Sequence, residues 1–91
     1  MTVSQLPLLR IFTLFGHPLR VVVFKPLART PVSGGELARG LPISRPAVVQ
    51  HLKLLEGARL IAACAAGRKR VYRVQPRGLA SVTGWLAQYS R

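Results

Sequence analysis

Residues 43–60 read ISRPAVVQHLKLLEGARL, and this stretch decides the fold. On a helix at about 100° per residue, Val48, Leu52 and Leu55 fall in one narrow apolar stripe, which needs a core to cover it. The opposite side is small, polar and lightly charged, unlike the acidic and basic mixture of an ordinary solvated helix. We therefore expect a partner to cover that side. It consists of Pro46, Gln50 and Lys53, flanked by Ala47 and Val49.

The residues before this helix predict a turn and a second, shorter helix. Ser44 is a good N-cap for the long helix, because its hydroxyl can accept a hydrogen bond from a free N–H of the first turn. A short helix over 35–41 is predicted to precede it, capped by Ser33 or Gly34. A tight turn at 42–43 joins the two, and this outline is that of a helix-turn-helix.

Two more helices are predicted upstream. Residues 6–15 carry apolar side chains on more sides than one helix face can hold, so we expect one side to meet the core and another to meet a dimer partner. The next helix begins at Pro18, since a missing N–H has no cost in the first turn. Pro26 removes an interior hydrogen bond, which predicts a bend or an early end near Lys25.

After Gly57 the apolar pattern changes from that of a helix to that of strands. We expect strands over 60–65 and 70–74, joined by a basic tip at 66–69, and a last helix that begins at Pro76. The predicted fold is therefore mainly α with a small β-hairpin, in the order α-α-α-α-β-β-α of a winged helix-turn-helix. We expect residues 1–91 to form a single domain. The apolar stripe of the last helix contains Leu79, Val82, Leu86 and Tyr89, with Trp85 beside it.

The charge balance indicates the class of partner. The 14 Lys and Arg residues face 2 Asp and Glu residues, which gives a formal net charge of +12. Such a positive field favours a polyanionic binding partner. Nucleic acid is the first candidate and an anionic membrane is the second. We expect no membrane partner, because the basic residues are spread along the chain and the longest apolar run is too short to span a bilayer.

The same composition leaves little material for catalysis. Glu36 and Glu56 are the only acids, too few for paired acid–base chemistry or for a hard-metal site, so no enzymatic activity is expected. Cys64 is the only cysteine, which excludes an internal disulfide and indicates a reducing compartment. We therefore expect a cytoplasmic protein associated with the bacterial nucleoid.

A recognition helix lies in the major groove and reads base edges from its N-terminal half, while basic side chains hold phosphates. Arg45 opposes the helix dipole unless a phosphate sits there. Gln50 can pair with adenine, and Ala47 and Val49 can touch thymine methyl groups. The basic hairpin is expected over a minor groove or an adjacent backbone. The sequence predicts no catalytic and no metal-binding residue. The predicted DNA-contacting residues are Ser44, Arg45, Pro46, Ala47, Val49, Gln50, His51, Lys53, Arg68, Lys69, Arg70 and Arg73.

Over residues 6–90 the chain resembles the ArsR/SmtB family of small dimeric winged-helix repressors. The resemblance implies a homodimer built from the first and last helices, which binds a short inverted repeat in double-stranded DNA as a repressor. The most specific match is the S-x-P-x-V-x-x-H-L core at 44–52. The other matching segments are His17-Pro18-Leu19-Arg20, Gly35-Glu36-Leu37-Ala38, the remainder of 43–55, and 67–74.

Four residues depart from the pattern of that family. His17 replaces an acidic helix cap and Gln75 replaces Asp or Asn before Pro76, and each is expected to cap less well, at a cost of about 1 kcal/mol. Val49 replaces a serine, so a hydroxyl contact is lost. Arg59 stands where the family usually has a glycine, and it is expected to be strained if the backbone there is left-handed.

Many members of that family sense metals through cysteines in the helix at 35–41 or through Asp, His and Glu in the last helix, and both sets are missing here. A repressor without a metal cofactor is therefore the leading hypothesis. His51 is given a structural or phosphate-contacting role, and Cys64 that of a small apolar filler. The alternative is a nonspecific basic protein, architectural or RNA-associated, which predicts steep salt dependence without sequence preference.

Overall fold

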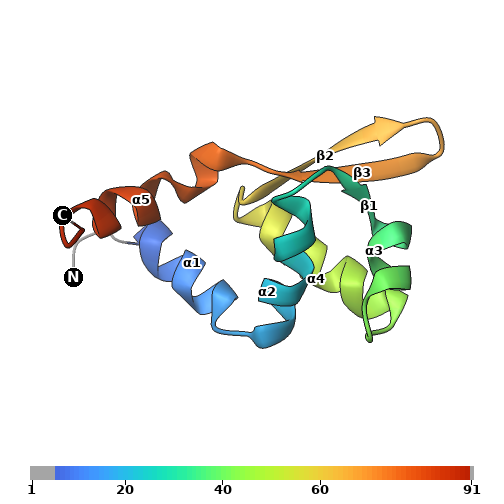
Figure 1. The fold of residues 1–91 in the computed structure, drawn as a ribbon, viewed down its shortest axis with the longest axis horizontal. Coiled ribbons are helices and arrows are strands. Elements are labelled where there is room, and N and C mark those ends of the chain that lie inside the picture. Colours follow the sequence, from blue (N-terminus) through green and yellow to red (C-terminus); the bar gives the residue numbers. More distant parts are fainter. Residues whose placement is uncertain (1–5, 91) are drawn as a thin grey trace.

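The computed structural model describes residues 6–90. Figure 1 shows α2, α3 and α4 beneath a long hairpin of β2 and β3, with α1 beneath α5 at the other end of the molecule. This is the winged helix-turn-helix predicted from the sequence, with one additional strand. Its elements are α1 (Leu6–Phe15), α2 (Pro18–Leu27), β1 (Val32–Ser33), α3 (Gly34–Gly40), α4 (Arg45–Gly57), β2 (Ile61–Ala66), β3 (Lys69–Val74), the 3₁₀ helix η2 (Pro76–Leu79) and α5 (Ala80–Ala87).

The additional strand, β1, lies in what the sequence predicted to be a connector. Val32 pairs with Tyr72, so β1 joins the antiparallel sheet on the far side of β3 from β2, and the strand order is β1-β3-β2. The hairpin is also tighter than expected. Ala66 pairs with Lys69, which leaves a turn at Gly67 and Arg68 in place of a tip at 66–69. Gly67 supplies the positive φ of 65° that a two-residue turn requires.

The predicted stripe of α4 forms the centre of the core. Val48, Leu52 and Leu55 are each 0% exposed, which confirms this part of the prediction. They pack with apolar side chains of α1, α2, α3 and the sheet. In β3 the buried residue is Tyr72, although the sequence had singled out its valines instead. The wing is therefore anchored to the helical core through an aromatic ring.

The two ends of α2 show what Pro26 and His17 do there. The helix continues two residues past Lys25 to Leu27, because Pro26 lies in its last turn, where the amides of Ala28 and Arg29 bond to the carbonyls of Lys25 and Pro26. His17, expected to cap less well than an acid, does cap α2: its Nδ1 accepts a hydrogen bond from the amide of Leu19 at 3.2 Å. Histidine can do this because its imidazole carries an unprotonated nitrogen.

The other helix ends follow the expected chemistry. The hydroxyl of Ser33, rather than Gly34, caps α3 by accepting from the amide of Glu36. Gln75 makes no side-chain capping bond, which confirms the poorer cap expected there. The last helix, expected to be continuous from Pro76, is divided into η2 and α5.

The end of α4 contains the expected backbone strain. Arg59 has φ = 62°, the left-handed conformation that favours glycine. Its amide donates to the carbonyl of Glu56 at 2.9 Å, and the amide of Leu60 donates to the carbonyl of Leu55 at 3.0 Å. These two bonds form a Schellman motif, which stops the helix and turns the chain into β2.

None of the described helices is by itself long and apolar enough to cross a membrane. Only α1 and α2 taken together, across a bend of 99°, reach the required length and composition.

Candidate nucleic-acid interface

The outward side of α4 is at the surface, as the sequence predicted. Pro46, Gln50 and Lys53 are exposed, and Ala47 and Val49 are half-buried beside them. The hydroxyl of Ser44 caps the helix by accepting from the amide of Ala47 at 3.3 Å, which fixes where the helix begins. This side of α4 therefore does not pack into the subunit's own core.

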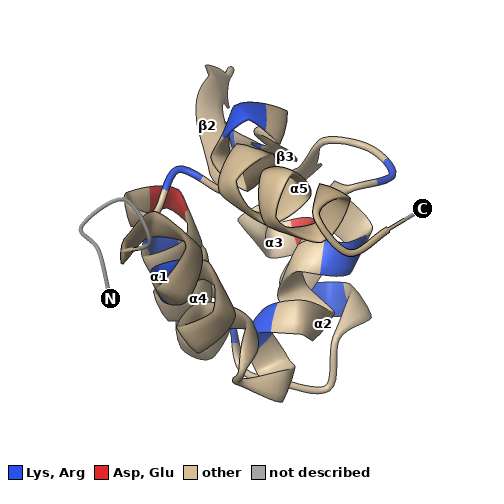
Figure 2. Ribbon diagram, turned by 90° about the vertical axis from the view of Figure 1, so that its left-hand side faces the viewer, with Lys and Arg blue, Asp and Glu red and all other residues tan. Residues whose placement is uncertain are grey.

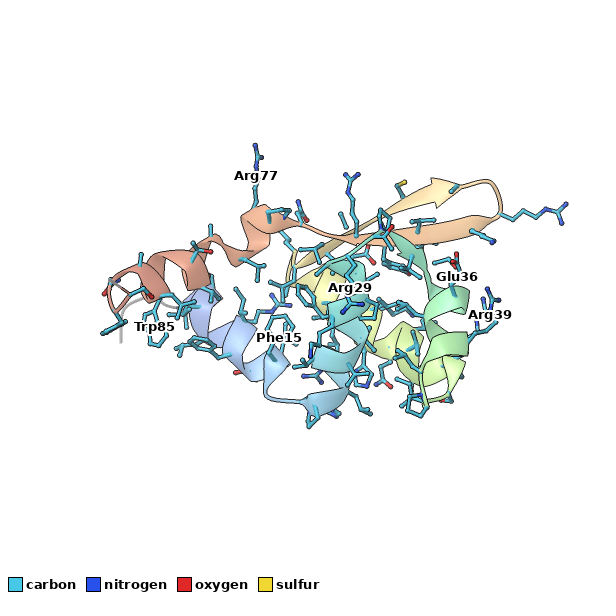
Figure 3. The ribbon with its side chains drawn as sticks, in the orientation of Figure 1. Phe15, Arg29, Glu36, Arg39, Arg77 and Trp85 are labelled. Carbon is cyan, nitrogen blue, oxygen red and sulfur yellow. The ribbon has the colours of Figure 1, made fainter. Side chains whose placement is uncertain are left out.

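A cationic cleft of about 350 Å³ lies between α3, the start of α4 and the wing. It brings Arg45 and Val49 of α4 together with three predicted wing residues, Arg68, Lys69 and Arg70. Arg39 of α3 also lines the cleft, and the sequence did not predict it because its place there depends on how α3 packs against the wing. Figure 3 shows Arg39 and Glu36 projecting from the same helix.

The field of the interface is almost entirely positive. Figure 2 shows basic residues on several elements, whereas the acidic ones lie only on α3 and α4. On α3, the hydrogen bond from Ser33 lowers the pKa of Glu36 below its usual value, and Lys69 and Arg39 act in the same direction. Glu36 therefore stays ionised beside the cleft and offsets part of its positive charge.

An ion pair ties the wing to α4. Nη2 of Arg70 donates to Oε2 of Glu56 at 2.7 Å, and this hydrogen bond raises the pKa of Arg70. Both side chains are too exposed for the pair to stabilise the fold by much. Its effect is to position the wing, and it partly neutralises one of the predicted wing cations.

Two predicted contact residues are not brought to this surface. Arg73 is exposed on β3 but does not line the cleft. His51 is 9% exposed and lies 5.0 Å, between ring centroids, from His17. Of the two roles expected for His51, burial therefore favours the structural one.

Comparison with known proteins identifies the family. Residues 15–62 of this chain match a protein family described as "Helix-turn-helix domain". The HTH-type transcriptional regulator Rv2034 of Mycobacterium tuberculosis is 52% identical over 63 residues, which are 69% of this chain but only 59% of that regulator. The ArsR-like transcriptional regulator from Rhodococcus sp. RHA1 has a TM-score of 0.86 at 26% identity, over 97% of this chain and 83% of its own. This chain belongs to the ArsR family.

A second ArsR-family regulator of known structure, RHA00566, has a TM-score of 0.81 at 28% identity and covers 100% of this chain and 99% of its own. These relatives are transcriptional regulators and not enzymes. In this ArsR-family chain, no three His, Cys, Asp or Glu side chains among residues 6–90 lie close enough to hold a metal ion. Cys64 is exposed on β2, so it does not fill the core as the sequence suggested.

The His51 site of this ArsR-family protein predicts a pH dependence of stability. Burial lowers the pKa of His51, and the nearby His17 and Arg20 lower it further. Its Nδ1 is buried and has no hydrogen-bond partner among residues 6–90. An unfolded chain, with a histidine pKa of about 6.5, therefore binds more protons than the folded one in the range below that pH.

We therefore expect the free energy of unfolding to fall as the pH is lowered from about 7.5 to about 5. Urea denaturation across this range measures it; Glu36, whose pKa is lowered from 4.5, adds a loss of the same sign only at the acid end of the range, where an unfolded Glu begins to bind protons. His51→Gln, which cannot be protonated, should make the dependence shallower. If the free energy of unfolding of His51→Gln depends on pH as steeply as that of the wild type, another group causes the dependence.

Proposed function

We propose that this protein is a sequence-specific transcriptional repressor that binds a short inverted repeat in double-stranded DNA as a homodimer, without a metal-sensing site. The observation that carries this proposal is the outward side of α4. Gln50 is exposed between the half-buried Ala47 and Val49, beside a cleft with basic residues from three elements. Such a protein works on the nucleoid, in the bacterial cytoplasm.

In this proposal the N-terminal half of α4 enters the major groove. Gln50 reads an adenine, and Ala47 and Val49 contact thymine methyl groups. Arg39 joins the residues that hold the backbone, because it shares the cleft with Arg45. His51 and Arg73 are left out, and the proposed set is Ser44, Arg45, Pro46, Ala47, Val49, Gln50, Lys53, Arg68, Lys69 and Arg70 together with Arg39.

A surface on α1 and α5 supports the homodimer. We call it the α1/α5 surface, and it consists of Leu9, Phe12, Trp85, Leu86 and Tyr89, all of them exposed. The ring of Trp85, labelled in Figure 3, lies 5.4 Å from that of Phe12 and 5.2 Å from that of Tyr89, centroid to centroid. Within 80–87, α5 has no buried residue, so a second copy is the natural cover for this surface.

Selection of bound duplexes from a random library tests the proposal. We expect an inverted repeat to emerge, and fluorescence anisotropy should then show it binding about 10³-fold or more tightly than a scrambled duplex at physiological salt. A ratio below about tenfold would support the nonspecific basic protein instead, because charge alone gives salt-dependent affinity without sequence preference.

Two single variants distinguish a residue that contacts bases from one that binds the DNA backbone. Gln50→Ala is expected to lose about 1–3 kcal/mol on the selected duplex and to relax preference at one base pair. Arg68→Ala, in the wing turn, should weaken all duplexes alike and make the salt dependence shallower. Anisotropy on the selected duplex and on its single-base variants measures both. Identical behaviour of the two proteins would show that α4 is not docked as proposed.

A further inference from the structure

A second cavity, of about 320 Å³, lies at the C-terminal end of α4. In Figure 1 this is the end of α4 nearer to α1 and α5, away from the wing tip. Its walls come from the first half of α1, from the Schellman turn at 57–59 and from η2. None of its lining residues belongs to the proposed DNA-contacting set.

Two arginines, Arg10 and Arg59, line this cavity, and Nη2 of Arg10 lies 3.8 Å from the position that a Cβ on Gly57 would take. The chain has 2 Asp and Glu residues in all. Glu56 is held by Arg70 at 2.7 Å, and Glu36 accepts a hydrogen bond from Ser33 at 2.9 Å on α3. No side-chain carboxylate of the described chain therefore neutralises the two arginines, and the site favours an anion from outside.

The rest of the wall is apolar or open. Leu6, Pro7 and Ile11 supply apolar surface from α1. Gly57 keeps the space beside Arg10 clear, because a Cβ added there would lie 3.8 Å from Nη2 of that arginine. A cationic end and an apolar wall in one cavity suit a ligand that has both a negative head and an apolar body.

The backbone at Arg59 adds an independent observation. It has φ = 62°, a conformation that glycine adopts without strain and arginine does not. Strain of this kind is concentrated at ligand and active sites, where the side chain is needed in place. Here the strained residue is one of the two arginines that line the cavity.

We propose that this cavity binds a small amphipathic carboxylate, with its head between Arg10 and Arg59 and its apolar body against Pro7 and Ile11. The volume is near the lower limit for small-molecule sites, so the ligand is small. This binding does not depend on DNA and can be measured on the protein alone.

Octanoate is the probe, followed by ¹H–¹⁵N correlation spectra of the full chain. We expect saturable shifts of the amides of Gly57, Arg59 and Gly78. 1-Octanol has the same apolar chain but no carboxylate, and acetate has the carboxylate but no apolar chain. Each should bind at least about tenfold more weakly than octanoate.

Variants locate the site. Arg59→Gly removes one guanidinium and relieves the left-handed strain, so it should stay folded and bind octanoate about tenfold more weakly. Gly57→Leu fills the cavity without changing charge and should also abolish saturation. Arg77→Gln is the matched control, since Arg77 projects away from the body of the molecule (Figure 3) and should leave binding unchanged.

Three results would overturn the proposal. One is a set of shifts centred on the α1/α5 surface instead of the cavity. Another is 1-octanol binding as tightly as octanoate, which would leave the arginines without a role. The third is unchanged octanoate binding by folded Arg59→Gly.

Discussion

Replacing Gly78 with alanine is expected to lower the free energy of unfolding by about 3 kcal/mol. A Cβ at this position would overlap the carbonyl oxygen of Arg59, and it would lie 2.8 Å from the carbonyl carbon of that residue and 3.1 Å from Cα of Leu60. All three are backbone atoms, so no side-chain rotation can relieve the overlap. The backbone of η2 must then move away from the end of α4.

That movement is costly because other contacts hold the two segments together. The amide of Gln75 donates to the carbonyl of Leu60 at 2.9 Å, immediately before η2. Leu60 itself is 0% exposed, and its amide belongs to the Schellman motif that ends α4. Gly78→Ala must therefore break a hydrogen bond, disturb a buried side chain or distort the helix end.

Gly84→Ala is the matched control for this prediction. Gly84 lies in α5, and a Cβ added there meets nothing within 4 Å. Alanine is the better helix former, so this change should raise stability by about 1 kcal/mol. Urea denaturation monitored by circular dichroism measures both variants. A Gly78→Ala protein as stable as the wild type would contradict the close backbone contact.

The parts of the fold that were predictable are those set by local chemistry. The stripe of Val48, Leu52 and Leu55 repeats at helical spacing, and the caps at Ser33 and Ser44 act on amides within their own first turn. Gln50 was placed outward by the same periodicity. For these features the sequence neighbours are also the structural neighbours.

The features that were missed depend on partners distant in sequence. β1 has two residues and exists because it pairs with Tyr72, about forty positions away. The break between η2 and α5 lies where Gly78 meets the backbone of Arg59. Arg39 enters the cationic cleft only because α3 packs against the wing. No periodicity within these segments carries that information.

The largest functional effect is expected from a charge placed on the α1/α5 surface. Leu86→Asp should weaken the proposed homodimer at least about 100-fold, which corresponds to about 2.8 kcal/mol. Leu86 is 47% exposed on α5, so a single subunit tolerates the change. In a dimer the same carboxylate would be buried without a partner. Sedimentation velocity measures the loss of dimer, and anisotropy should show the inverted repeat bound no better than a half-site.

Val22→Asp is the matched control, because Val22 is 37% exposed on α2, outside the α1/α5 surface, and receives the same charge. It should leave the dimer intact.

The dependence of dimerisation on salt is a second test. Each subunit carries a formal charge of +12, so screening should strengthen association of the wild type while it weakens DNA binding. A dimer that dissociates as salt rises, or that survives Leu86→Asp, would have to use a different and more polar surface.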